Sequence, residues 1–142
     1  MIYSLPARIR IKALVVLVLI FAVGTWGLIR LRTYRRQSAA TSALQTGMAA
    51  YEAKEYGQAA TDLGRYLLVD HDNIDVLLIY GDAQMQRRPQ TEGTLRQAVS
   101  AFETVLRLQP GHPRACETLV QFYLQANAPV EAERVARAWQ QV

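Results

Sequence analysis

Cysteine and histidine are scarce in this chain, which has one and two of them among 142 residues. The single cysteine, Cys116, cannot form an internal disulfide. Structural zinc takes about four nitrogen or sulfur ligands, more than Cys116, His71 and His112 provide together. No neighbouring histidine would activate Cys116 as a nucleophile, and the glycines are too scattered for a phosphate-binding loop. The sequence therefore predicts no metal site, no cofactor, no small-molecule substrate and no enzymatic activity.

Acidic side chains are absent from residues 1–36, where seven basic side chains stand. From residue 37 onward the balance reverses, with nine basic and twelve acidic residues. The basic residues of the first part flank an apolar run, and such clusters contact anionic lipid headgroups more often than DNA or RNA. We therefore expect no nucleic acid partner. The residues assigned to lipid headgroups are Arg8, Arg10, Lys12, Arg30, Arg32, Arg35 and Arg36.

A long apolar run lies between these basic clusters. Residues 13–29 are 17 residues without a charge, and Ile11 extends the run if Lys12 reaches toward the headgroups. Because no small-residue cleavage site follows, we expect an uncleaved transmembrane helix over 11–30, between a basic tail over 1–10 and a basic helical connector over 31–40. The alternative is a buried core helix, which rarely lacks a polar stripe for this long. Gly24 and Gly27 would pack the span against other spans.

The kind of membrane and the orientation rest on weaker signs. Basic residues on the two sides of the span are nearly balanced, so the positive-inside rule leaves the side of the following domain open. Arginine outnumbers lysine by fourteen to two, which is typical of a GC-rich bacterial genome. We therefore expect a single-pass membrane protein of a bacterium, and the resemblance described below implies the inner membrane.

Helix-forming sequence dominates after the span. Residues 30–55 contain no proline, so the membrane helix either continues through them or breaks within residues 38–42, where Ser and Thr weaken it. Further helices are expected at about 41–53, 56–69, 74–87, 94–108, 113–126 and 129–141. The β-branched residues are too scattered for strands, so the predicted fold class is all-α. The expected helix caps are Asp72 or Asn73, Thr94, and Asn127 or Ala128.

Three triplets on helical spacing indicate an internal repeat. Each has a small residue followed by apolar ones at i+4 and i+7, which share one face of a helix. The second and third triplets lie 34 residues apart, as do Gly47 and Gly81. This period predicts an array of about three helix pairs, a fold that binds other proteins. The triplets are Ala59, Leu63 and Tyr66, then Ala98, Phe102 and Val105, then Ala132, Ala136 and Trp139.

These residues resemble the tetratricopeptide repeat family, a superhelical stack of helix pairs. Gly47 and Gly81 match the small residue of the first helix of a pair, Phe102 the aromatic residue of the second helix, and Pro110 the closing proline. The resemblance covers about residues 40–142, so the repeat domain is expected over 41–142, with repeats at about 41–73, 74–112 and 113–142.

The resemblance also implies a concave groove, lined by the first helix of each pair, for a peptide, a helix or a neighbouring subunit. The alternative is that the same side chains pack against neighbouring helices. Chaperone-binding members hold a terminal carboxylate with Lys, Asn and Arg, and only Arg114 fits that pattern, so we expect no such clamp. The groove residues implied are Leu44, Met48, Tyr51, Leu78, Asp82, Met85, Arg114, Gln121 and Leu124.

Two departures from the repeat pattern suggest further surfaces. Ala59 and Ala98 lie 39 residues apart, so about five extra residues within 87–97 are expected to form a projecting loop, either functional or a neutral insertion. No polar capping helix follows the third pair. Val135 and Trp139 are therefore expected at an open end, which either continues into a further helix or docks on a partner.

The sequence as a whole predicts a membrane-anchored scaffold or adaptor that brings proteins together at the bilayer surface. The layout resembles that of bacterial inner-membrane proteins with an anchored tetratricopeptide domain, which favours the periplasmic side. One alternative is a structural accessory subunit of a large membrane complex, held through its transmembrane helix. Another is a mitochondrial-type import receptor.

Overall fold

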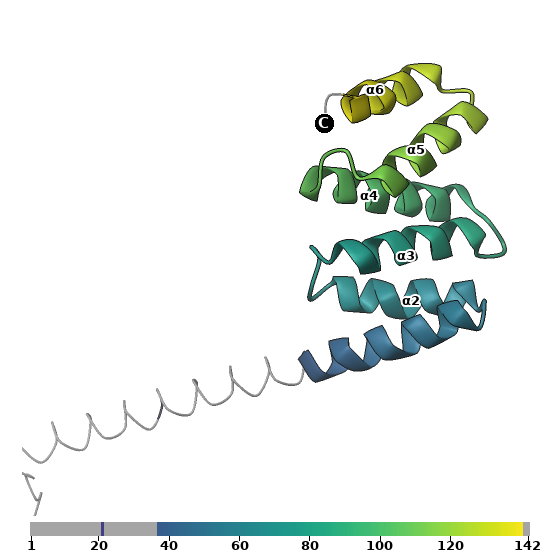
Figure 1. The fold of residues 1–142 in the computed structure, drawn as a ribbon. Helices are drawn as coiled ribbons and strands as arrows, with labels where there is room; N and C mark the ends of the chain where they lie inside the picture. The colour runs from purple at the N-terminus through teal and green to yellow at the C-terminus, as the bar shows by residue number, and fades with distance from the viewer. Residues whose placement is uncertain (1–20, 22–36, 141–142) are drawn as a thin grey trace, which may run out of the picture. The chain divides into compact units, whose positions relative to one another are not determined.

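The computed structural model describes residue 21 and residues 37–140, and all regular structure within these residues is helical. A first helix covers residues 37–52. It is followed by α2 (Tyr56–Leu67), α3 (Ile74–Gln86), α4 (Glu92–Leu108), α5 (Pro113–Gln125) and α6 (Pro129–Gln140). Each labelled helix packs on the next along the chain, which produces the stack of helices seen in Figure 1.

The expected membrane span lies outside the described residues, as do Gly24, Gly27 and the seven basic residues assigned to headgroups. Within 11–30 only Phe21 is described, as a helical and exposed residue. The helices that the structure describes include none with the length and apolar character needed to cross a membrane. Residues 37–52 are helical throughout, so the break considered within 38–42 does not occur.

Side-chain caps fix where α3 and α4 begin. Asn73 caps α3, with its Oδ1 accepting a hydrogen bond from the Val76 N–H at 3.2 Å. The cap of α4 is Thr91, so the expectation for Thr94 was wrong. Thr94 instead occupies the third helical position, where its hydroxyl accepts from the Thr91 N–H at 3.0 Å and its own N–H donates to the Thr91 hydroxyl at 3.2 Å. This reciprocal capping box satisfies two backbone donors at once.

The turn before α6 shows which of the two expected caps, Asn127 or Ala128, begins this helix. Asn127 has a φ of 55°, a left-handed conformation, whereas a residue that caps a helix N-terminus takes an extended one. The carbonyl of Ala128 accepts the first helical hydrogen bond, from the Ala132 N–H at 3.2 Å. The start of α6 is therefore set by Ala128 and by Pro129 at its first position, which tolerates proline.

Glycine lets the two helices of a pair approach closely. A Cβ atom on Gly81 would lie 2.7 Å from Cζ of Phe102, and one on Gly47 would lie 2.8 Å from Cδ2 of Leu63. Both distances are shorter than real Cβ contacts. The matched spacing of Gly47 and Gly81 thus has a direct packing reason. Each glycine lets the first helix of its pair approach the second, the helix over 37–52 approaching α2 and α3 approaching α4.

The apolar faces of the triplets form the interior of the array. Leu63, Phe102 and Val105 are fully buried, and Phe102 belongs to a core cluster with residues of α3, α4, α5 and α6. The third triplet is less enclosed, because Trp139 keeps 41% of its surface exposed. The core therefore lies chiefly between α3 and α5, around Phe102.

The extra residues between α3 and α4 do not all form a loop. Helix α4 has 17 residues, whereas α2 and α6 have 12 each. Part of the insertion therefore lengthens α4 at its N-terminal end, where the capping box of Thr91 and Thr94 stabilises the added turn. The connecting segment is short and covers only residues 87–91. The expected loop of extra residues within 87–97 is therefore confined to 87–91, and the other extra residues are helical.

Candidate partner-binding groove

Three of the expected groove residues meet, one from the first helix of each pair. Asp82 on α3 forms an ion pair with Arg114 on α5, in which the same carboxylate oxygen, Oδ2, accepts from the guanidinium. The hydroxyl of Tyr51, on the helix over 37–52, lies 3.5 Å from that oxygen. The structure thus brings Tyr51, Asp82 and Arg114 together, although they are 31 and 32 residues apart in sequence. We call these residues the Asp82 cluster.

Burial and charge act in opposite directions on Asp82. Its side chain is only 15% exposed, and this burial raises the pKa of the carboxyl group above its usual range. The Arg114 guanidinium and the Tyr51 hydroxyl both lower that pKa, with less effect than burial. Burial also raises the pKa of the Tyr51 phenol. Asp82 thus pairs with Arg114 within the chain, while the Arg114 side chain remains 54% exposed.

Replacing Arg114 by glutamine is expected to raise the pKa of Asp82 further and to lower the free energy of unfolding at neutral pH. The loss should be about 1 kcal/mol, because Arg114 is half exposed and solvent screens the pair. A carboxyl group whose pKa is raised by folding favours the folded state at low pH, and this contribution is lost as the pH rises through the folded pKa. The difference between variant and wild type should therefore shrink in acid. Urea unfolding at several pH values and NMR titration of Asp82 measure both effects.

Arg137→Gln is the matched control for this variant. Arg137 pairs with Glu133 one helical turn away, and their side chains are 73% and 61% exposed. An exposed pair of this kind contributes little to stability. Equal losses in the two variants, or an unchanged pKa of Asp82 in Arg114→Gln, would contradict the assigned role of Arg114.

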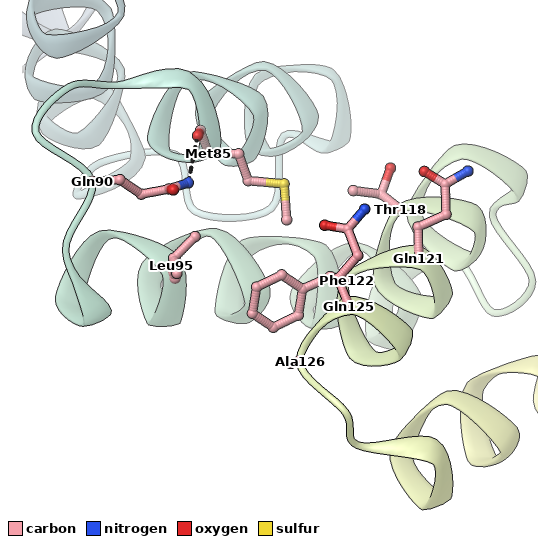
Figure 2. A pocket seen from close by; sticks show the side chains of 8 residues that line it. All are labelled: Met85, Gln90, Leu95, Thr118, Gln121, Phe122, Gln125 and Ala126. Atoms are coloured by element: carbon pink, nitrogen blue, oxygen red, sulfur yellow. Dashed lines mark hydrogen bonds between the residues drawn. The ribbon is translucent and has the colours of Figure 1, made fainter.

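A pocket of about 440 Å³ lies where the C-terminal ends of α3 and α5 face the start of α4. Two expected groove residues, Met85 and Gln121, line it. Figure 2 shows the Met85 side chain extending from α3 toward the Phe122 ring of α5, with Leu95 of α4 below. The polar lining residues are Gln90, Thr118, Gln121 and Gln125.

The remaining expected groove residues are placed differently. Leu78 is 6% exposed and belongs to the core cluster, so it does not line a groove. It lies one residue from Leu77, and both side chains face the interior because α3 is covered on two sides by α2 and α4. Leu44 and Met48 are half-buried, whereas Leu124 is 60% exposed. Leu78 is therefore separated from the other apolar residues expected in the groove, which are Leu44, Met48, Met85 and Leu124.

The end of the array at α6 differs from the sequence expectation, because one of the two residues expected there is buried. Val135 is 6% exposed and part of the core cluster, because the face of α6 that carries it packs against α5. Only Trp139 of the two is exposed. Val130, at the start of α6, is 73% exposed. The large apolar residues exposed on this last helix are thus Trp139 and Val130.

The cysteine and the two histidines, considered above for metal binding and catalysis, lie in the core, at a helix cap and in an exposed turn. Cys116 is 1% exposed, and burial raises the pKa of its thiol. His112 caps α5, with its Nδ1 accepting from the Ala115 N–H at 3.4 Å. His71 is exposed in the turn before α3. Among the described residues no group of three or more His, Cys, Asp or Glu is arranged to hold a metal ion.

The structure is thus an array of helix pairs. The first helices of successive pairs meet at the Asp82 cluster, and α3 and α5 also line the pocket at Met85. Residues 91–141, which include α4, α5 and α6, match the sequence model of the tetratricopeptide repeat. Repeats of this family generally mediate protein–protein interactions. None of the curated proteins compared with the chain matches it. The helices before residue 91 lie outside the match and are joined to the array by the packing of α2 on α3 and of α3 on α4.

Sequence analysis missed Gln90, Leu95 and Phe122 as groove residues. Gln90 lies in the insertion, to which the repeat pattern assigns no groove position, and Leu95 follows the added turn of α4. A comparison of equivalent positions in successive repeats would have found Leu95, since it stands where the first repeat has Tyr56.

Proposed function

We propose that this chain is a membrane-anchored scaffold whose helical repeats bind a protein partner and assemble a membrane-associated complex. The observation that carries the proposal is the convergence of Tyr51, Asp82 and Arg114 from three successive first helices, beside the pocket at Met85. The Asp82 cluster holds the first helices together, so the groove is formed before a partner arrives. Preformed sites bind with a smaller entropic cost.

The membrane part of the proposal rests on the sequence. Residues 13–29 carry no charge and are flanked by basic clusters, a pattern typical of a transmembrane helix with headgroup contacts on both sides. We place the anchor in a bacterial inner membrane, with the repeat domain on the periplasmic side. The lipid bilayer and a protein are then the two partners of the chain.

Photocrosslinking of the full chain in native membranes tests the proposal. A photoreactive residue at Gln121, which is exposed in the groove, should give a discrete adduct with another protein after carbonate washing of the membranes. The same residue at Thr61, exposed on α2, is the matched control and should give none. Leu19→Arg with Ile20→Arg should release the chain into the carbonate supernatant, because charges at the centre of a span are strongly unfavourable.

Each outcome separates the proposal from its main alternative. An accessory subunit held by its span would give no adduct at Gln121 and would lose its associated proteins when Gly24 and Gly27 are replaced by leucine. A scaffold should keep the Gln121 adduct in that variant. Extraction of the wild-type chain by carbonate would show that the anchor assignment is wrong.

A further inference from the structure

The pocket at Met85 corresponds to a place that is filled by tyrosines one repeat earlier. The 34-residue spacing of Gly47 and Gly81 relates Tyr51 to Met85, and the 39-residue spacing of Ala59 and Ala98 relates Tyr56 to Leu95. Between the first two pairs the rings of Tyr51 and Tyr56 pack edge to face, with centroids 5.7 Å apart, against a buried cluster that contains Ala83.

The second interface has smaller side chains on two of its walls. Met85 and Leu95 stand where the two tyrosines would be, and Phe122 of α5, which takes the place of Ala83, forms the third wall. The residues at this interface surround a space of about 440 Å³, which is within the usual size range of ligand sites.

The lining of the pocket is uncharged. Met85, Leu95 and Phe122 are apolar, and the polar lining consists of three glutamine amides and the hydroxyl of Thr118. A charged side chain that entered this space would lose its hydration without meeting an opposite charge, which is costly. The pocket therefore selects an uncharged apolar group.

The amides around the pocket suit an extended backbone. Gln90 donates its amide N–H to the Met85 carbonyl at 2.8 Å, which leaves its Oε1 to accept from a ligand. Gln121 donates to Glu117 at 3.4 Å, with the same consequence for its own Oε1. An extended peptide exposes backbone N–H and C=O groups that amides can pair with, whereas a helix satisfies most of these groups internally.

We infer that this pocket receives one uncharged apolar side chain of an extended segment of the partner protein, while the amides of Gln90, Gln121 and Gln125 bind that segment's backbone. The inference rests on the proposed function, because it names the partner's chemistry at the same groove. It also gives the insertion between α3 and α4 a role. The inserted residues supply Gln90 as one wall of the pocket, and their capping box positions Leu95 in the first turns of α4.

A selection from phage-displayed linear nine-residue peptides against the full chain in detergent micelles tests this inference. The wild type should enrich peptides with one apolar position, and replacing that residue by lysine in a synthetic peptide should abolish binding. Met85→Tyr with Leu95→Tyr rebuilds the tyrosine pair of the first interface and places two rigid rings in the pocket, which should obstruct the entry of a partner side chain. The affinity of a selected peptide, measured by fluorescence polarisation, should then fall about tenfold or more, as expected when a leucine-sized side chain is no longer buried.

Controls keep the two hypotheses distinguishable. Val130→Tyr adds a tyrosine at an exposed position of α6 and should leave the affinity unchanged. Gln90→Ala with Gln125→Ala should weaken binding severalfold without filling the pocket, and circular dichroism checks that each variant is folded.

If wild type and Met85→Tyr/Leu95→Tyr bind the same peptides equally, the groove binds peptides but the pocket inference is wrong. If lysine at the apolar position is tolerated, the inference is likewise wrong. If no peptide is enriched while Gln121 still crosslinks to a protein, the scaffold remains and the extended-peptide partner is excluded.

Discussion

Replacing Phe102 by alanine should lower the free energy of unfolding by about 3–5 kcal/mol, the range measured for buried aromatic residues. Phe102 is the largest fully buried side chain among the described residues. Its ring lies directly over Gly81, which has no side chain that could move into the space left behind. The neighbouring helices would have to shift to close the cavity, so the loss should fall at the upper end of the range for a phenylalanine.

Urea unfolding of the full chain in detergent micelles, followed by circular dichroism, measures this loss. Leu68→Ala is the matched control, because Leu68 is 85% exposed and its truncation should change the stability by less than about 0.5 kcal/mol. A loss below about 1 kcal/mol for Phe102→Ala would contradict the placement of the ring at the centre of the array.

The helical part of the fold could be predicted from the sequence because its signals are local. The repeated glycines and the apolar triplets predict which faces pack, and the contacts of Gly81 with Phe102 and of Gly47 with Leu63 confirm those faces. The start of α4 was misplaced because two threonines three residues apart can both cap a helix. Only the reciprocal hydrogen bonds between Thr91 and Thr94 decide which residue is the cap.

The groove was less predictable than the helices because it depends on how neighbouring pairs are placed. The resemblance put Tyr51, Asp82 and Arg114 on one surface, but their mutual contact needs the offset between successive first helices, which periodicity does not provide. Leu78 was misassigned for the same reason, since α3 is covered on both sides and an end helix is not. The pocket depends on how α3, α4 and α5 are placed around it and on Gln90 of the insertion, which a single repeat does not reveal.

Replacing Gly81 by valine should be the second severe substitution, with a loss of about 3 kcal/mol from overpacking. Its Cβ atom would lie 2.7 Å from the Phe102 ring, which is fully buried and has no room to retreat. Gly57→Val is the matched control, because a Cβ atom at Gly57 would meet nothing within 4 Å. Valine there should change the stability by no more than a few tenths of a kcal/mol, in line with helix propensities. Urea unfolding distinguishes the two glycines.

The third helix pair suggests how the damage can be repaired. Helices α3 and α5 have 13 residues each, so Val120 occupies the position of Gly81, and Ala136 occupies that of Phe102. The large and small side chains have changed sides between these two pairs. Combining Gly81→Val with Phe102→Ala copies the third pair into the second, because the valine can enter the space that the ring vacates.

The double variant should therefore lose about 2 kcal/mol less than the sum of the two single losses, a coupling typical of residues in contact. A complete double-mutant cycle measured by urea unfolding gives this coupling directly. If the two losses simply add, Gly81 and Phe102 do not share one space, and the close approach of α3 and α4 must have another cause. If they couple as expected, the repeats accept either arrangement of large and small residues, which explains how Val120 and Ala136 fit an array otherwise based on glycine.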